Sequence, residues 1–148
     1  MAIILEVGVN TYVTLEEANS ILEAVFDNEE WKLLTDEQKK VCLVNAANKI
    51  NLLAVKGSKL DTEQALIFPR NWETAVANSV KMAQCYETLE ICRYNYKRDR
   101  EQQSGIVSRS MDNVSVTYAK QSNRRKGLYS KDAFDLLRGY LILTYTRC

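Results

Sequence analysis

A single proline, Pro69, places the strongest constraint on how this chain can fold. It lies in residues 64–70, which read Gln-Ala-Leu-Ile-Phe-Pro-Arg, with helical hydrophobic patterns on both sides. Proline fixes its own φ angle, lacks a backbone N–H and pushes the preceding residue into an extended conformation. The sequence therefore predicts a rigid, non-helical corner between two helices, formed by Phe68, Pro69 and Arg70.

Arg70, at the end of this corner, has two interpretations. It is either an interface residue or a structural one, which binds carbonyl oxygens or pairs with a nearby carboxylate such as Glu73. We favour the structural role. The two tryptophans, Trp31 and Trp72, are both predicted to pack in the core or against another subunit.

Capping boxes predict the starts of two helices before the corner. In Thr14 with Glu17, and again in Thr35 with Gln38, each side chain can bind the backbone of the other residue. Apolar residues at helical spacing follow each box. Between the two helices, Trp31 is expected to anchor a short helical turn onto the core.

In the second half of the chain, the hydrophobic pattern changes from helical spacing to alternation. A third helix is predicted over about residues 75–101, after Gly57 has ended the second one. Alternating residues then predict a β-hairpin or extended excursion over about residues 105–120. Polar and basic residues predict a loop over about residues 120–128.

Ser130 is placed to cap a last helix, with Asp132 in its first turn. The length fits a single domain, residues 1–148. The expected fold is therefore mainly α: a small bundle of four to five helices, with a β-hairpin or extended excursion before the last helix.

The chain has no histidine, which removes the commonest general base near neutral pH and the histidine-based triads and zinc motifs. The four cysteines form no Cys-x-x-Cys pair and are expected to be buried, small apolar residues in a reducing compartment. We predict no catalytic residues, no metal site and no cofactor, and we expect the protein not to be an enzyme. No run of about 18 apolar residues occurs, so we expect a soluble intracellular protein without a membrane partner.

Charge is distributed unevenly along the chain. Residues 1–92 hold 8 Lys and Arg against 14 Asp and Glu, a net charge of −6. Residues 93–131 hold 10 against 3, a net charge of +7. This two-signed pattern favours head-to-tail contact between copies of the chain, or contact of the basic part with nucleic acid.

Five segments carry a resemblance to a known family. They are residues 10–18 (Asn-Thr-Tyr-Val-Thr-Leu-Glu-Glu-Ala), 56–59 (Lys-Gly-Ser-Lys), 64–70, 105–110 (Gly-Ile-Val-Ser-Arg-Ser) and 114–118 (Val-Ser-Val-Thr-Tyr). In this order and at this spacing, the chain resembles the head–tail connector (head-completion adaptor) proteins of tailed bacteriophages and related prophages. In that family, the corner segment typically reads Gln-x-Leu-x-Trp/Phe-Pro-Arg.

This resemblance implies a structural adaptor of a phage or prophage virion. Such proteins form a ring, commonly of twelve copies, between the portal protein and the tail or stopper protein, and they extend the channel for genomic DNA. The implied location is the head–tail interface of the virion, with assembly in the host cytoplasm. The resemblance implies neither catalysis nor a cofactor, and only non-specific contact with DNA.

Two surfaces follow from this interpretation as hypotheses. A ring needs a contact between two different surfaces of neighbouring subunits. On one subunit we expect three arginines, Arg93, Arg98 and Arg100. On its neighbour we expect an acidic face made of Glu16, Glu23, Asp27, Glu29 and Glu30. The second surface consists of the loop cations Arg124, Arg125 and Lys126. They contact the channel DNA or the portal protein, or they are solvated and contact neither.

The alternative function is that of a single-stranded-DNA-binding replication accessory protein, a description that some related proteins carry. This alternative requires the basic segment to form a groove with exposed aromatic residues. Tyr118 and Tyr129 are the aromatic residues nearest the basic loop, although packing is the commoner role for such side chains.

Overall fold

The computed structural model describes residues 3–104 and 127–142, and it describes side chains for all of these except residues 95–104. This part of the chain contains six helical elements: α1 (Leu15–Glu23), α2 (Glu29–Lys32), α3 (Asp36–Asn51), α4 (Asn78–Ser104), α6 (Lys131–Leu137) and the 3-10 helix η1 (Arg138–Tyr140). The β-bridges within it are isolated pairs and form no sheet. The predicted small helical bundle is therefore confirmed. The excursion expected over about 105–120 lies outside the described residues, as does most of the loop at 120–128.

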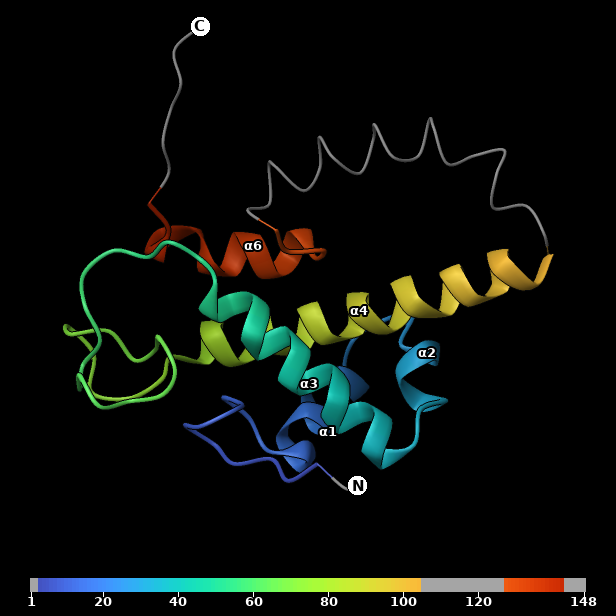
Figure 1. Ribbon diagram of the computed structural model, residues 1–148, viewed down its shortest axis with the longest axis horizontal. Coiled ribbons are helices and arrows are strands. Elements are labelled where there is room, and N and C mark those ends of the chain that lie inside the picture. The colour runs from blue at the N-terminus through green and yellow to red at the C-terminus, as the bar shows by residue number, and fades with distance from the viewer. Residues whose placement is uncertain (1–2, 105–126, 143–148) are drawn as a thin grey trace, which may run out of the picture.

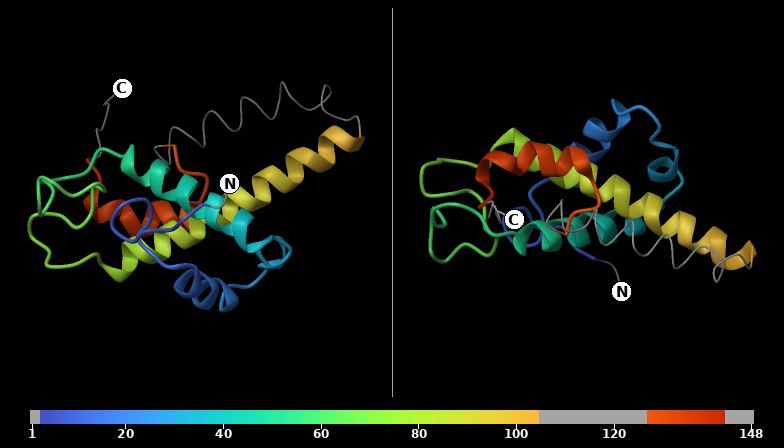
Figure 2. Two further views of the ribbon diagram at one scale, coloured as in Figure 1. Left: turned by 60° about the horizontal axis from the view of Figure 1, so that its bottom comes forward. Right: turned by 90° about the horizontal axis from the view of Figure 1, so that it is seen from above.

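Helix α4 is the centre of the bundle. It packs most extensively against α3 and α6, and it also contacts α1 and α2 (Figure 1). Its last turns extend beyond the other helices, as Figure 2 shows in two further views. Among the helices of the described residues, none combines the length and the apolar composition that crossing a membrane requires.

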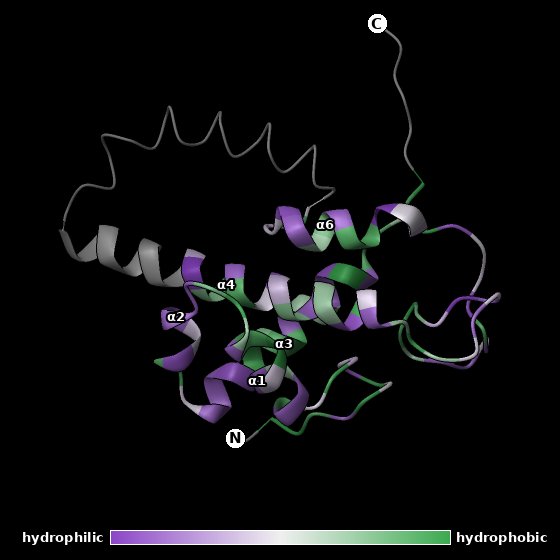
Figure 3. Cartoon of the chain, turned by 180° about the vertical axis from the view of Figure 1, so that it is seen from behind, coloured by the Kyte–Doolittle hydropathy of each residue, from purple (hydrophilic) through white to green (hydrophobic). Residues whose placement is uncertain are grey.

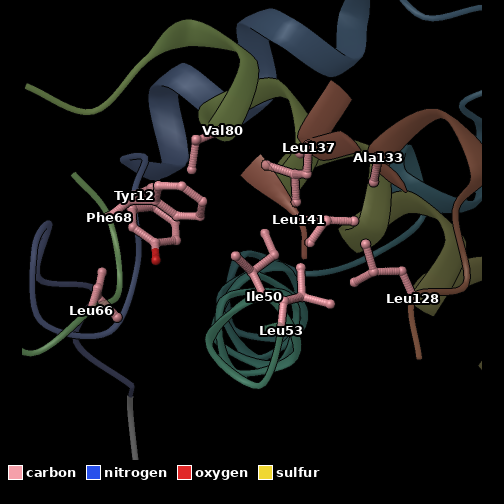
Figure 4. Packing of buried hydrophobic residues seen from close by; sticks show 11 residues of the cluster. Tyr12, Ile50, Leu53, Leu66, Phe68, Val80, Leu128, Ala133, Leu137 and Leu141 are labelled. Atoms are coloured by element: carbon pink, nitrogen blue, oxygen red, sulfur yellow. The ribbon is translucent and has the colours of Figure 1, made fainter. Parts of the chain in front are cut away.

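Two buried clusters hold these elements together. One joins the corner to α3, α4 and α6, and it includes Tyr12, Ile50, Phe68, Val80 and Leu137 (Figure 4). The other lies between α1, α2, α3 and α4, and it includes Val13, Leu22, Trp31, Leu43 and Leu89. Tyr86 of α4 packs against both clusters, so a single helix links them. Apolar residues gather where these helices meet, and polar residues cover the outer faces of α1 and α2 (Figure 3).

Both predicted capping boxes are present. The Thr14 hydroxyl accepts from Glu17 N at 3.1 Å, and the Glu17 carboxylate accepts from Thr14 N at 3.3 Å. Thr35 and Gln38 make the equivalent pair at 3.2 and 2.9 Å. Each cap contributes about 1 kcal/mol to helix stability. The helix starts were therefore predictable from local sequence.

The end of α3 differs from the prediction. The helix ends at Asn51, well before Gly57. Asn51 Oδ1 accepts from the Tyr12 hydroxyl at 3.0 Å and from Ile67 N at 3.2 Å. These contacts fasten the end of the helix to the corner, which local sequence could not indicate. Gly57 instead lies in the following loop with φ of +77°, a conformation that glycine adopts readily.

Gln84 of α4 has a fully buried side chain that joins three parts of the fold. Its Oε1 accepts from Tyr12 N at 2.9 Å. Its Nε2 donates to Thr11 Oγ1 at 2.8 Å and to Leu43 O at 2.9 Å. A buried side chain amide needs such partners, because a polar group without them destabilises the fold. Gln84 thereby attaches the N-terminal segment to α3 and α4.

We predict that Gln84→Leu lowers the free energy of unfolding by roughly 2 to 4 kcal/mol, because it leaves buried polar groups on Tyr12 and Leu43 without partners. Urea unfolding followed by circular dichroism measures this change. Asn48→Leu, on the exposed side of α3, is the matched control and should change stability by less than about 0.5 kcal/mol. Equal effects of both substitutions would contradict the proposed role of Gln84.

Candidate functional site

The corner at Phe68, Pro69 and Arg70 is non-helical, as predicted, and contains a cis Phe68–Pro69 peptide bond. Arg70 is only 4% exposed. Its Nε donates to Lys56 O at 3.0 Å, and its Nη1 donates to Ile67 O at 2.7 Å. Its backbone N donates to the carboxylate of Glu73 at 3.0 Å. These contacts correspond to the structural interpretation of Arg70, in which the guanidinium holds two loop segments together.

An aromatic platform, formed by Trp72 and Tyr140, lies next to this corner. The two rings are nearly parallel, with centroids 6.1 Å apart and planes 18° apart. The Tyr140 hydroxyl donates to Glu73 Oε2 at 2.6 Å, and burial together with this contact raises the pKa of Tyr140. Trp31 is buried, as predicted, whereas Trp72 is 56% exposed. Trp72 therefore does not pack in the core, and its packing against another subunit stays a prediction.

Glu87 of α4 is a second buried polar side chain with contacts far along the sequence. Its two carboxylate oxygens accept from Tyr129 N at 2.7 Å and from Ser130 N at 2.9 Å. Lys49 Nζ of α3 lies 3.9 Å from the carboxylate. Burial raises the pKa of Glu87 and lowers the pKa of Lys49. The carboxylate thus anchors the start of α6 to α4.

The Tyr129 ring reinforces this anchor. It stacks on Tyr94 of α4 with centroids 5.0 Å apart and planes 14° apart. Lys49 Nζ lies 3.4 Å from the centroid of the Tyr129 ring and donates to Gly127 O at 3.2 Å. Tyr129 therefore serves as a packing residue, and Tyr118 lies outside the described residues.

These contacts bring the two ends of the positively charged stretch together. Residues 95–126 contain 8 Lys and Arg against 3 Asp and Glu, a net charge of +5. The stretch begins directly after Tyr94, which stacks on Tyr129, and it ends directly before Gly127. Lys49 contacts both Gly127 and the Tyr129 ring. Tyr94 and Gly127, the two residues that flank the stretch, are therefore held in one region of the bundle.

Arg93 has its acidic partners within the same chain. Its guanidinium lies 2.7 Å from the carboxylate of Glu90, 3.7 Å from that of Glu30 and 3.8 Å from that of Asp27. It also donates to the backbone oxygen of Asp27. Arg93 Nε and Glu30 Oε2 are buried and otherwise lack hydrogen-bond partners, so this pair is held by charge.

The other residues of the predicted interface occupy varied positions. Glu16, Glu23 and Glu29 are exposed on α1 and α2. Arg98 and Arg100 belong to α4, but their side chains are not described. The loop cations Arg124, Arg125 and Lys126 lie outside the described residues. No contact between subunits tests any of these residues, and the interface stays a prediction.

Gln84 and Glu87 are buried polar positions that the sequence analysis missed. Val80, Gln84, Glu87 and Ile91 follow one another at intervals of three or four residues, which places them on one face of a helix. All four side chains are buried. That spacing is visible in the sequence, but the sequence analysis did not single out these two polar residues. Among the residues with described structure, no group of His, Cys, Asp and Glu is placed to hold a metal ion.

Three cysteines, Cys42, Cys85 and Cys92, are buried with free thiols, as predicted. Cys42 and Cys92 connect α3 to α4 with their Sγ atoms 3.6 Å apart. Burial raises the pKa of the Cys85 thiol to about 12, which keeps this thiol protonated near neutral pH. These side chains behave as packing groups. Cys148 lies outside the described residues.

We predict that Glu87 makes stability fall as pH rises. Its folded-state pKa lies above the ordinary value of 4.5, so the folded state holds the proton more tightly than the unfolded state. The stabilisation from Glu87 is complete below pH 4.5 and is lost as pH rises through the folded-state pKa. Urea unfolding at a series of pH values should show that this loss is absent in Glu87→Gln.

The control for this pH series is Glu63→Gln, which removes an exposed carboxylate from the loop before the corner. It should reproduce the wild-type dependence on pH. Lys49 and Glu90 also face Glu87 and are unchanged in both variants. Parallel pH profiles for the wild type and Glu87→Gln would contradict the assignment.

One family model matches nearly the whole chain, over residues 1–147. The description of that family is "Putative DnaT-like ssDNA binding protein". No curated protein and no solved structure matches the sequence. The match covers all the elements described above and the charged stretch between Tyr94 and Gly127.

This match overturns the resemblance to head–tail connectors. The expected adaptor function, the ring with portal and tail or stopper partners, and the virion location were wrong, because the family that matches is described by single-stranded DNA binding. The motifs used for the resemblance, such as the corner and the capped first helix, are structural features of the bundle, and they do not specify a partner. The chain belongs to the family described as "Putative DnaT-like ssDNA binding protein".

Proposed function

We propose that this protein binds single-stranded DNA, and that the positively charged stretch of residues 95–126 supplies its contacts to phosphates. The family description supports the ligand class. The observation that carries the proposal is that both ends of this stretch are held near Lys49: Tyr94 stacks on Tyr129, and Lys49 contacts the Tyr129 ring and Gly127 O. A net charge of +5 is thereby attached to one region of the bundle.

The electrostatic physics suits this ligand. Lys and Arg side chains that contact phosphates release condensed counterions, so binding is favourable at low salt and largely independent of base sequence. Residues 1–92 carry a net charge of −6 and are expected to repel the same phosphates. The two-signed charge pattern would then orient the strand toward one part of the molecule.

The three loop cations Arg124, Arg125 and Lys126 are part of this proposal as non-specific phosphate contacts. They directly precede Gly127, whose carbonyl oxygen accepts from Lys49 Nζ. We expect binding without turnover of the DNA, because the chain contains no histidine and its buried carboxylate Glu87 is occupied by two backbone N–H groups. That expectation remains a prediction.

We predict that the double variant Arg124→Gln/Arg125→Gln weakens binding to a labelled deoxythymidine oligonucleotide. Loss of two phosphate contacts should reduce the slope of log K against log salt by about 1.4, since each contact to a single strand contributes about 0.7. Fluorescence anisotropy at several salt concentrations measures both the affinity and the slope.

The matched control is Lys32→Gln/Lys40→Gln, which removes the same charge from α2 and α3 in the acidic part of the chain. Its slope should equal that of the wild type. If both double variants lower the slope equally, net charge alone governs binding and the assignment to residues 95–126 is wrong. Absence of any binding by the wild type at low salt would refute the function itself.

A further inference from the structure

We propose that the aromatic platform of Trp72 and Tyr140 is a base-stacking site, in which an unpaired base of single-stranded DNA lies on the exposed ring of Trp72. This inference rests on the proposed function. It adds a second site, distinct from the charged stretch and carried by described residues. Stacking of a base on an aromatic side chain tolerates any sequence, because every base has a π face.

The exposure of Trp72 is the first observation. Its side chain is 56% exposed, while Trp31 is 2% exposed, although both belong to the same small bundle. A tryptophan ring is a large apolar surface, and the core has aromatic positions of its own at Tyr12 and Phe68. An exposed tryptophan held in a fixed position is therefore suited to contact with a ligand.

The fixed position of the ring is the second observation. Tyr140 lies nearly parallel to the Trp72 ring. Gly57 lies so close that a Cβ atom there would be 2.5 Å from Trp72 Cζ3. The Phe68 ring meets Tyr140 edge to face, with centroids 4.8 Å apart, and connects the platform to the buried core. A ring that is already ordered loses little conformational entropy when a base binds.

Hydrogen bonds connect the platform to the corner. Lys56 N donates to Tyr140 O at 2.7 Å, and Lys56 O accepts from the buried Arg70 guanidinium. Glu73 joins the Tyr140 hydroxyl to Arg70 N through its two carboxylate oxygens. Tyr140 is therefore attached to the corner through hydrogen bonds to Glu73 and Lys56, and Trp72 stacks on Tyr140. The corner's role is to position Trp72.

Exposed cations favour a nucleic-acid strand over an apolar protein surface as the occupant. Lys56 and Arg138 are exposed and lie in the two segments that hold the rings. Lys59, in contrast, donates to Gln64 O. Phosphates on either side of a stacked base can contact such cations, and arginine also stacks on bases.

The platform is also within reach of the charged stretch. The segment from Lys131 to Tyr140, which forms α6 and η1, directly connects the Tyr94–Tyr129 stack to the Trp72–Tyr140 stack. Ten helical residues span about 15 Å. Binding sites for single strands cover roughly 4 to 16 nucleotides, so one strand is long enough to contact both places.

Tryptophan fluorescence tests this proposal directly. Titration of the wild type with a 16-nucleotide deoxythymidine oligomer should quench the emission, because the exposed Trp72 stacks on a base while the buried Trp31 does not. In Trp72→Phe the remaining emission should not change. Anisotropy of a labelled oligomer measures binding independently of the tryptophans.

Affinity gives a second readout. Trp72→Ala should weaken binding by about 5-fold to 150-fold, the range for loss of one stacked base. Phe26→Ala is the matched control, because Phe26 is 95% exposed in the acidic part of the chain, and it should leave the affinity unchanged. Gly57→Ala should also weaken binding by displacing Trp72. Gly8→Ala introduces a similar positive-φ strain, with nothing within 4 Å, and should not weaken it.

The outcomes separate this inference from the proposed function. If the wild type binds the oligomer but neither Trp72 emission nor the affinity of Trp72→Ala changes, the stacking site is wrong and the proposed function stands. If the wild type does not bind, both are wrong. If Trp72 emission instead depends on protein concentration without DNA and light scattering shows self-association, the platform is a contact between copies of the chain, and the inference is overturned.

Discussion

The fold depends on two polar side chains buried on one face of α4. Gln84 and Glu87 lie about one turn apart on this helix. Gln84 holds the N-terminal segment, and Glu87 holds the start of α6. Gln84 binds Thr11, Tyr12 and Leu43, while Glu87 binds the backbone at Tyr129 and Ser130. Because a buried polar group without partners is strongly unfavourable, these side chains specify where the two segments attach.

This constraint shapes the surface proposed to bind DNA. Glu87 fixes the start of α6, shortly after residues 95–126, and the Arg70 guanidinium holds the loop that carries Trp72. In both cases a buried charged group organises backbone, and the residues available to a ligand lie just beyond it. The charged groups with the most internal contacts are therefore positioning residues, and they are not the ones expected to touch a strand.

Charge complementarity along the sequence did not distinguish contacts within the chain from contacts between copies of it. Arg93 and the carboxylates Asp27 and Glu30 were predicted to meet between neighbouring subunits, yet they pair within one chain. Opposite charges can pair within one folded chain or between two chains. The sequence alone does not distinguish these outcomes. The family match then removed the ring for which that contact was predicted.

The sequence by itself determined the helix starts at Thr14, Thr35 and Ser130 and the non-helical corner at Pro69, because capping and proline geometry act over a few residues. It also determined the unequal charge of the two halves. Only the tertiary structure decided that Trp72 is exposed while it stacks on Tyr140, and that Glu87 is buried and accepts a hydrogen bond from Tyr129 N. The physical reason is that exposure depends on which distant segments cover a side chain, and residues 42 positions apart meet here only through packing of α4 with α6.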